Sequence, residues 1–123
     1  MTFADPVAAK NAASARWLSI VGIGEDGVAA LSPTARALVE SAEVVFGGQR
    51  HLALAASLIR GRARPWPTPF GRAVAEVLGE RPKRVCVLAS GDPFPYGIGA
   101  QLARQVPPAE MVAILTEDLW TQV

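Results

Sequence analysis

Two glycine-rich segments hold the residue types best suited to binding a ligand through the backbone. The first, GIGEDG at residues 22–27, matches the pattern G-x-G-x-x-G and follows a short apolar run. In dinucleotide-binding proteins such glycines bring the first turn of a helix against a pyrophosphate. Here the helix signal begins only at Ser32, and Glu43 precedes the second apolar run instead of ending it. The segment therefore favours a tight turn, or a backbone surface for another ligand, over a dinucleotide site.

The second segment, SGDPFPYGIG at residues 90–99, combines stiffening prolines with glycines that allow close backbone approach. Asp92 comes just after a continuous apolar run, where a carboxylate is unusual for packing alone. It could accept hydrogen bonds from amine or hydroxyl groups of a ligand. It could equally cap its own turn, as Asp-Pro pairs often do. The spacing alone leaves both explanations open.

The remaining reactive side chains indicate little chemistry. His51 is the only histidine and could act as an acid or base, although a solvated or capping role is more typical of its position. Cys86 lies inside an apolar run and is expected to be a buried hydrophobe. No cluster of Cys and His has the spacing of metal ligands, so no metal is expected. The basic runs at residues 60–64 and 81–84 are expected to be solvated edges, or guiding charge for a polyanionic substrate.

The elements that must position these residues alternate between apolar runs and amphipathic segments. The pattern predicts strands at residues 18–21, 44–46, 85–89 and 111–115, and helices from Ser32 to Ala42 and at residues 49–60, 72–78 and 97–105. No element is predicted over residues 62–70, which hold three prolines. Alternation of this kind predicts an α/β fold with a parallel sheet flanked by helices. Ligands bind beyond the carboxyl ends of such strands, which is where both glycine-rich segments lie.

The overall composition fits one α/β domain of a soluble protein. The 123 residues are 50% hydrophobic and 19% charged, which excludes a disordered chain. A net charge of +1 gives no general field for nucleic acid or a membrane surface, and no apolar stretch has the length of a transmembrane helix. One cysteine and the lack of a signal-peptide pattern predict a cytoplasmic protein. Residues 1–16 are expected to form a flexible tail.

Several of these segments together resemble a known family. They are VGIG at residues 21–24, LS at 31–32, SAEVV at 41–45 with Gly47, and LASGDP at 88–93 with Tyr96 and Gly97. In this order they resemble the tetrapyrrole (corrin/porphyrin) methyltransferases. GQRHL at residues 48–52, together with residues 90–99, is most similar to the precorrin-6Y C5,15-methyltransferases of cobalamin biosynthesis. The resemblance covers residues 17–114, read as the N-terminal domain of the tetrapyrrole methylase fold.

The resemblance implies an S-adenosylmethionine-dependent methyltransferase whose substrate is a precorrin. It implies that the cofactor contacts Glu25, Ser90, Gly91, Asp92 and Pro95, and that Gly22 and Gly24 face the substrate. Moving a methyl group from a sulfonium to a ring carbon depends mainly on positioning and proximity, so no catalytic acid or base is assigned. Because such substrates carry many carboxylates, the resemblance also strengthens the hypothesis that the basic runs at residues 60–64 and 81–84 guide the substrate.

The resemblance ends before the chain does. Relatives continue into a second α/β domain that completes the cofactor cleft, whereas residues 115–123 do not resemble the family. We therefore expect a missing second domain and weak or no activity of this chain alone. A homodimer is expected, because family members are typically dimers and an uncovered domain face favours self-association. Two alternatives stay open: a non-catalytic binding or assembly domain of the same fold, and an NAD-binding oxidoreductase fragment. The ring carbon that is methylated, and whether the precorrin holds cobalt, stay open too.

Overall fold

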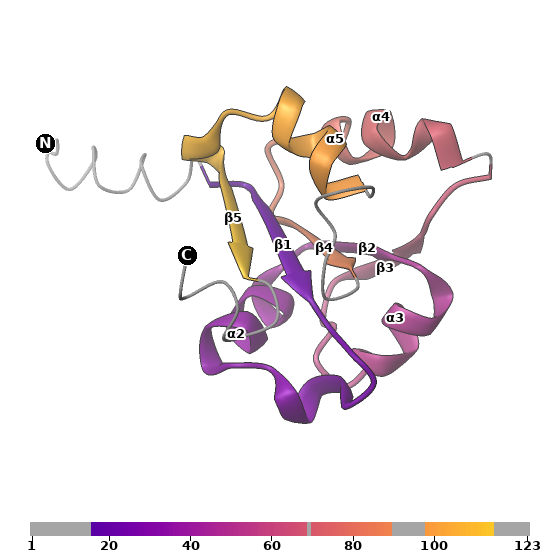
Figure 1. Ribbon diagram of the computed structural model, residues 1–123, viewed down its shortest axis with the longest axis vertical. Coiled ribbons are helices and arrows are strands. Elements are labelled where there is room, and N and C mark those ends of the chain that lie inside the picture. Colours follow the sequence, from indigo (N-terminus) through magenta and orange to yellow (C-terminus); the bar gives the residue numbers. More distant parts are fainter. Residues whose placement is uncertain (1–15, 69, 90–97, 115–123) are drawn as a thin grey trace, which may run out of the picture.

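A five-stranded parallel sheet forms the centre of the computed structural model, which describes residues 16–68, 70–89 and 98–114 (Figure 1). Its strands are β1 (Leu18–Gly22), β2 (Val44–Gly47), β3 (Arg62–Pro65), β4 (Val85–Ala89) and β5 (Met111–Ile114). They lie in the order β3-β2-β4-β1-β5, and every neighbouring pair is parallel. The predicted parallel α/β architecture is confirmed. Residues 1–15 and 115–123, which make up most of the two predicted tails, lie outside the described residues.

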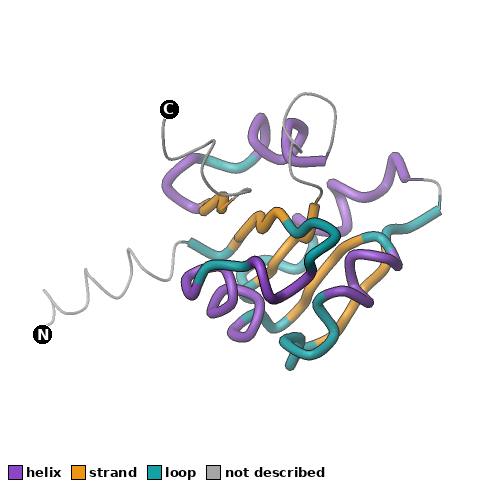
Figure 2. Tube along the Cα trace, turned by 60° about the horizontal axis from the view of Figure 1, so that its bottom comes forward, coloured by secondary structure: helices purple, strands orange, loops and turns teal. Residues whose placement is uncertain are grey.

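Helices cover both faces of this sheet. They are α2 (Pro33–Ser41), α3 (Gln49–Leu54), α4 (Ala73–Leu78) and α5 (Ile98–Gln105), with 3₁₀ turns η1 (Gly27–Ala30), η2 (Phe70–Arg72) and η3 (Pro108–Glu110). Figures 1 and 2 show α2 and α3 on one side of the sheet and α4 and α5 on the other. The start of α2 follows the sequence signal closely, because the Ser32 hydroxyl accepts a hydrogen bond from the Ala35 N–H at 3.1 Å. Within the described ranges, no helix is long and apolar enough to cross a membrane.

The core consists of two apolar layers separated by β4, whose five residues are all buried. Alternate residues of a strand point to opposite faces, so Val85 and Val87 pack with α4 and α5 while Cys86 and Leu88 pack with α2 and α3. Phe46, the largest fully buried side chain, belongs to the α4 and α5 layer. A continuous apolar run buried on both faces is typical of a central parallel strand.

The order of the strands determines where the fold opens. Because all five strands are parallel, their carboxyl ends lie at one edge of the sheet, which we call the carboxyl edge. The chain leaves β1 and β2 toward the helices of one face, and leaves β3 and β4 toward the helices of the other face. Strand β4 lies between β2 and β1, so its two neighbours both continue onto the face opposite to its own helix. Such a reversal separates the connecting segments and opens a crevice for ligands at the strand ends.

The structure differs from the predicted elements in two places. Residues 62–65 form the edge strand β3, although no element was expected there. Its pairing with β2 joins Val44 to Arg62 and Gly47 to Pro65, so backbone hydrogen bonds define the strand, and a proline is tolerated at its end because this is a sheet edge.

The helix predicted over residues 49–60 is shorter than expected. It ends at Leu54 and continues as turns, with a hydrogen bond from the Leu58 N–H to the Ala55 carbonyl at 2.9 Å. Consequently Ala56 is exposed, while Leu58 is buried.

Candidate ligand site at the carboxyl edge

The turn after β1 is hydrogen-bonded to the end of β4 and is exposed at its tip. The Ile23 N–H donates to the Ala89 carbonyl at 2.9 Å, and the Ile23 side chain is buried. Gly24 and Glu25 then lie exposed. Gly27 closes the turn with a hydrogen bond to the Gly24 carbonyl at 2.9 Å and with φ of +63°, a conformation that favours glycine. A Cβ placed on Gly24 would meet no atom of the described residues within 4 Å, so these residues leave the space beside this backbone open.

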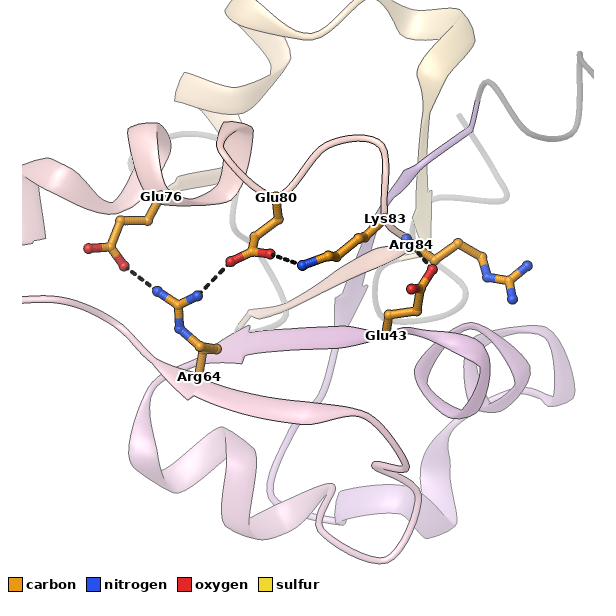
Figure 3. A network of polar contacts seen from close by, with 6 residues as sticks. All are labelled: Glu43, Arg64, Glu76, Glu80, Lys83 and Arg84. Carbon is orange, nitrogen blue, oxygen red and sulfur yellow. Dashed lines mark hydrogen bonds and ion pairs between the residues drawn. The ribbon is translucent and has the colours of Figure 1, made fainter.

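This geometry argues against a dinucleotide site. The turn η1 separates the glycines from α2, so the first turn of that helix does not approach them. Glu43 lies before β2, and its Oε2 accepts a hydrogen bond from the Arg84 N–H at 3.1 Å (Figure 3). It is therefore at the edge opposite the glycine turn, away from where a ribose would bind. Both objections raised by the sequence hold in the structure.

A second group of residues follows β2 at the same edge. Gly47 is buried where β2 and β4 meet, and a Cβ there would lie 3.2 Å from the Leu88 Cβ. Helix α3 begins two residues later and carries Arg50, whose guanidinium forms an ion pair with the Glu25 carboxylate. The two side chains keep 65% and 81% of their surface exposed. Since β4 lies between β2 and β1, this ion pair spans the region of the carboxyl end of β4.

His51 adjoins this ion pair. Its partial burial, followed by the nearby positive charge of Arg50, lowers the pKa of the imidazole below 6.5. The neutral form therefore predominates near pH 7, and a neutral imidazole offers one donor and one acceptor. A Cβ placed on Gly48 would lie 3.7 Å from the His51 Nδ1, which places the ring beside the glycine pair.

The predicted site residues are only partly within the described part of the chain. Gly22, the last residue of β1, is buried, while Gly24 and Glu25 lie exposed at the carboxyl edge. The other predicted cofactor contacts lie outside the described residues: Ser90, Gly91, Asp92 and Pro95. Sequence reasoning assigned no ligand-binding role to Arg50. The available signal was its place in GQRHL, directly after the glycines that end the second strand.

The basic runs have structural partners instead of facing the glycine turn. The Arg64 guanidinium donates to Glu76 Oε1 at 2.8 Å and to Glu80 Oε2 at 2.7 Å (Figure 3). It also lies 4.9 Å from the centre of the Phe46 ring. Lys83 donates to the other oxygen of Glu80 at 3.2 Å. The hydrogen bond from Lys83, more than that from Arg64, lowers the pKa of Glu80 below 4.5.

Other members of these runs lie at the opposite edge of the sheet. Arg60 precedes β3 and is 3.8 Å from a carboxylate oxygen of Glu40. Arg81 precedes β4 and lies 5.9 Å from the centre of the Trp17 ring. The edge at which strands begin is remote from the carboxyl edge in a parallel sheet. This placement argues against the hypothesis that the two basic runs guide a substrate to the glycine turn.

The buried thiol of Cys86 is unreactive in the folded chain. Cys86 is fully buried, and burial raises the pKa of its thiol to about 12, so it is no nucleophile in the folded chain, as predicted. Over the part of the chain that the structure describes, no group of three or more His, Cys, Asp or Glu side chains could hold a metal ion.

Comparison with known families agrees with this arrangement. The sequence profile of the tetrapyrrole (corrin/porphyrin) methylases matches residues 18–114, from the start of β1 to the end of β5. The chain belongs to this family. The sequence analysis predicted this family from segments that include the glycine turn at residues 22–27 and Gly-Asp-Pro at residues 91–93. That prediction is confirmed, and with it the N-terminal domain of the tetrapyrrole methylase fold.

Individual tetrapyrrole methylases show the same relationship. Over 95 residues the chain is 54% identical to a precorrin-6Y C(5,15)-methyltransferase (decarboxylating) of Sinorhizobium sp, covering 77% of this chain and 23% of that protein. A protein of the same name from Mycobacterium tuberculosis is 40% identical over 85 residues, covering 69% and 22%. A cobalt-precorrin-7 C(5)-methyltransferase of Salmonella typhimurium is 35% identical over 85 residues, covering 69% and 42%. The matches thus span about a quarter to two fifths of these relatives' lengths.

Proposed function

We propose that this chain forms one wall of an S-adenosylmethionine-dependent methyltransferase site that methylates a ring carbon of a precorrin, of the precorrin-6Y C5,15 type. The observation that carries the proposal is the 54% identity to a precorrin-6Y C(5,15)-methyltransferase over 95 residues. The exposed turn and ion pair at the carboxyl edge, where α/β sheets bind ligands, support it.

The described part of the site suits a cationic cofactor. S-adenosylmethionine would supply a methyl group on a positively charged sulfonium, and it also carries an ammonium group. Glu25 offers an exposed carboxylate beside the open backbone at Gly24. We propose that Glu25 contacts the cofactor together with Ser90, Gly91, Asp92 and Pro95, and that Gly22 and Gly24 face the precorrin. The open space at Gly24 would let a flat macrocycle approach the backbone closely.

The groups at this edge are binding groups, which suits methyl transfer. The attacking carbon belongs to the substrate and the leaving group to the cofactor, so the protein contributes mainly by holding the two in line. Glu25 and Arg50 provide opposite charges within one short stretch of the edge. A cationic cofactor and a polycarboxylate substrate would each find a complementary charge there.

We also propose that the protein works in the cytoplasm as a homodimer. The residues of β5 support self-association, because Met111, Val112 and Ile114 at the sheet edge are apolar and only partly buried. An edge strand of this kind is a common contact for a second copy. Light scattering would give twice the mass of the chain for a dimer, and the mass of one chain would contradict it.

Binding of S-adenosylhomocysteine, measured by calorimetry, tests the proposed cofactor site. We expect binding by the wild-type chain and roughly fivefold weaker binding by Glu25→Gln, because one charge-assisted contact is lost. Glu40→Gln is the matched control, since Glu40 lies in an ion pair with Arg60 and is remote from the carboxyl edge. Binding of NAD alone would contradict the proposal and favour an oxidoreductase fragment. Binding of neither compound would favour a non-catalytic domain.

A second experiment tests the substrate-facing glycine. Gly24→Leu should change the free energy of unfolding little, because Gly24 is exposed and no atom of the described residues lies within 4 Å of an added Cβ. It should nevertheless weaken binding of a tetrapyrrole such as uroporphyrin, because the side chain would occupy the space of the macrocycle. Unchanged uroporphyrin binding by a folded Gly24→Leu chain would show that Gly24 does not face the substrate.

A further inference from the structure

Arg50 differs from the arginines of the two basic runs in its position. It follows β2 and lies at the carboxyl edge, beside the end of β4. Arg60 and Arg81 lie at the opposite edge, and Arg64 is held by two carboxylates between β3 and α4. Arg36, in α2, donates to the Val28 carbonyl at 2.9 Å and thereby supports η1. Arg50 therefore brings a guanidinium to the place where the fold opens.

The partner of Arg50 is easily replaced. Glu25 and Arg50 both keep most of their side-chain surface in water, and exposed ion pairs of this kind add little to stability. The planar guanidinium can hold a carboxylate through two parallel hydrogen bonds. A carboxylate on an incoming ligand can thus replace the Glu25 carboxylate with almost no cost in folding free energy, and it gains the same type of contact.

We propose that Arg50 binds a carboxylate of the ligand, and that Glu25 holds the guanidinium at the site until this exchange takes place. The inference rests on the proposed function, which supplies a polycarboxylate substrate. The carboxylate could come from a side chain of the tetrapyrrole or from the methionyl end of the cofactor. Both would bind Arg50 through the same carboxylate–guanidinium contact, and the experiment below distinguishes between them.

The experiment compares three probes on the intact chain. Uroporphyrin carries tetrapyrrole carboxylates, S-adenosylhomocysteine carries the methionyl carboxylate, and methylthioadenosine carries none. Arg50→Gln should weaken uroporphyrin binding roughly tenfold, the usual effect of losing one charge-assisted pair. Glu25→Gln should strengthen it about two- to fivefold, because the competing carboxylate is gone. Arg60→Gln, which removes a similarly exposed and ion-paired guanidinium at the other edge, should leave it unchanged.

Each outcome decides the proposal. A loss confined to uroporphyrin identifies the tetrapyrrole as the source of the carboxylate. A loss for S-adenosylhomocysteine but not for methylthioadenosine identifies the cofactor. Equal losses in Arg50→Gln and Arg60→Gln, no loss in Arg50→Gln, or a loss for methylthioadenosine would each overturn the carboxylate-binding role.

The same titrations keep the proposed function distinguishable from this inference. Wild-type binding of S-adenosylhomocysteine without uroporphyrin, and without an effect of Arg50→Gln, would leave the proposed function standing and refute the exchange. Binding of uroporphyrin that depends on Arg50, without S-adenosylhomocysteine, would support the exchange and refute the proposed cofactor. Binding of neither probe would refute both. Equal urea midpoints of the variants would show that the chain remains folded.

Discussion

Gly61 offers the sharpest test of how the edge strand β3 is held to the sheet. A Cβ built on this residue would lie 2.3 Å from the Glu43 carbonyl oxygen and 2.6 Å from the Ala42 carbonyl oxygen. Contacts shorter than 3.0 Å are essentially absent for real Cβ atoms, so the two chain segments would have to separate by roughly 0.7 Å or more. Both obstacles are backbone atoms, which cannot swing away as the end of a side chain can.

The cost of Gly61→Ala can be worked out from the neighbouring contacts. Overpacking of this kind costs about 1–3 kcal/mol. The Glu43 carbonyl also accepts the Arg62 N–H at 2.9 Å, and displacing it would weaken a bond worth about 1 kcal/mol. The lower entropy of the unfolded alanine chain offsets about 0.4–1 kcal/mol of this loss. We therefore expect the free energy of unfolding to fall by about 1–3.6 kcal/mol.

Urea unfolding followed by circular dichroism would measure this loss. Gly71→Ala is the matched control, because a Cβ on Gly71 would meet no atom of the described residues within 4 Å. The control should change the free energy of unfolding by less than about 0.5 kcal/mol. If Gly61→Ala is no less stable than Gly71→Ala, the close approach of residue 61 to the segment before β2 is not a constraint, and the reasoning is refuted.

Three further predictions concern the helix cap, the ion-pair network and the buried thiol. Ser32→Ala should lower the free energy of unfolding by about 1 kcal/mol because the start of α2 loses its cap, whereas Ser41→Ala, whose hydroxyl makes only a 3.5 Å contact, should change it little; similar urea midpoints would contradict this. Arg64→Met should lower it by about 1–2 kcal/mol and Lys83→Met by less than about 0.5 kcal/mol, as thermal unfolding would show. Arg64 binds two partly buried carboxylates, those of Glu76 and Glu80, whereas Lys83 is itself half exposed and binds only Glu80. Burial raises the pKa of Cys86 from 9.0 to about 12, so only the unfolded thiol ionises in this interval, and the free energy of unfolding should fall as pH rises from 9.0 toward 12. Urea titrations of wild type and Cys86→Ala should diverge over that range, and parallel curves would rule this contribution out.

Local signals made much of the fold predictable. The run at residues 85–89 is continuously apolar because β4 is central and buried on both faces. Ser32 and Pro33 mark the start of α2 through a cap and a first-turn proline, both of which act within a few residues. By contrast, the sequence of β3 is Arg-Ala-Arg-Pro. Its one small apolar residue between two arginines, Ala63, gives no apolar face from which a strand could be predicted. Its place depends on pairing with β2 and on the close approach at Gly61, neither of which leaves a periodic pattern.

The candidate site was predictable in its parts but not in its assembly. The glycine turn and its exposed Glu25 follow from a strand that stops at glycines. The ion pair of Glu25 with Arg50 joins residues 25 positions apart. It joins segments that follow β1 and β2, two strands that lie on either side of β4, and this order is not evident from the sequence. The basic runs were open to misinterpretation for the same reason, since their sequence does not say at which edge of the sheet they lie.

Stability and ligand binding therefore depend on different groups of charged residues. Arg64, which is held by carboxylates of α4 and of the turn before β4, ties an edge strand to the rest of the domain. Arg50 and Glu25 are largely exposed at the carboxyl edge, where their pairing contributes little to folding. Arg64→Met should consequently lower the free energy of unfolding without changing ligand affinity measured well below the unfolding transition. Arg50→Gln should do the reverse. A crossed result, with Arg50 needed for folding, would mean that the exposed ion pair supports the β1 turn and is not available for exchange with a ligand.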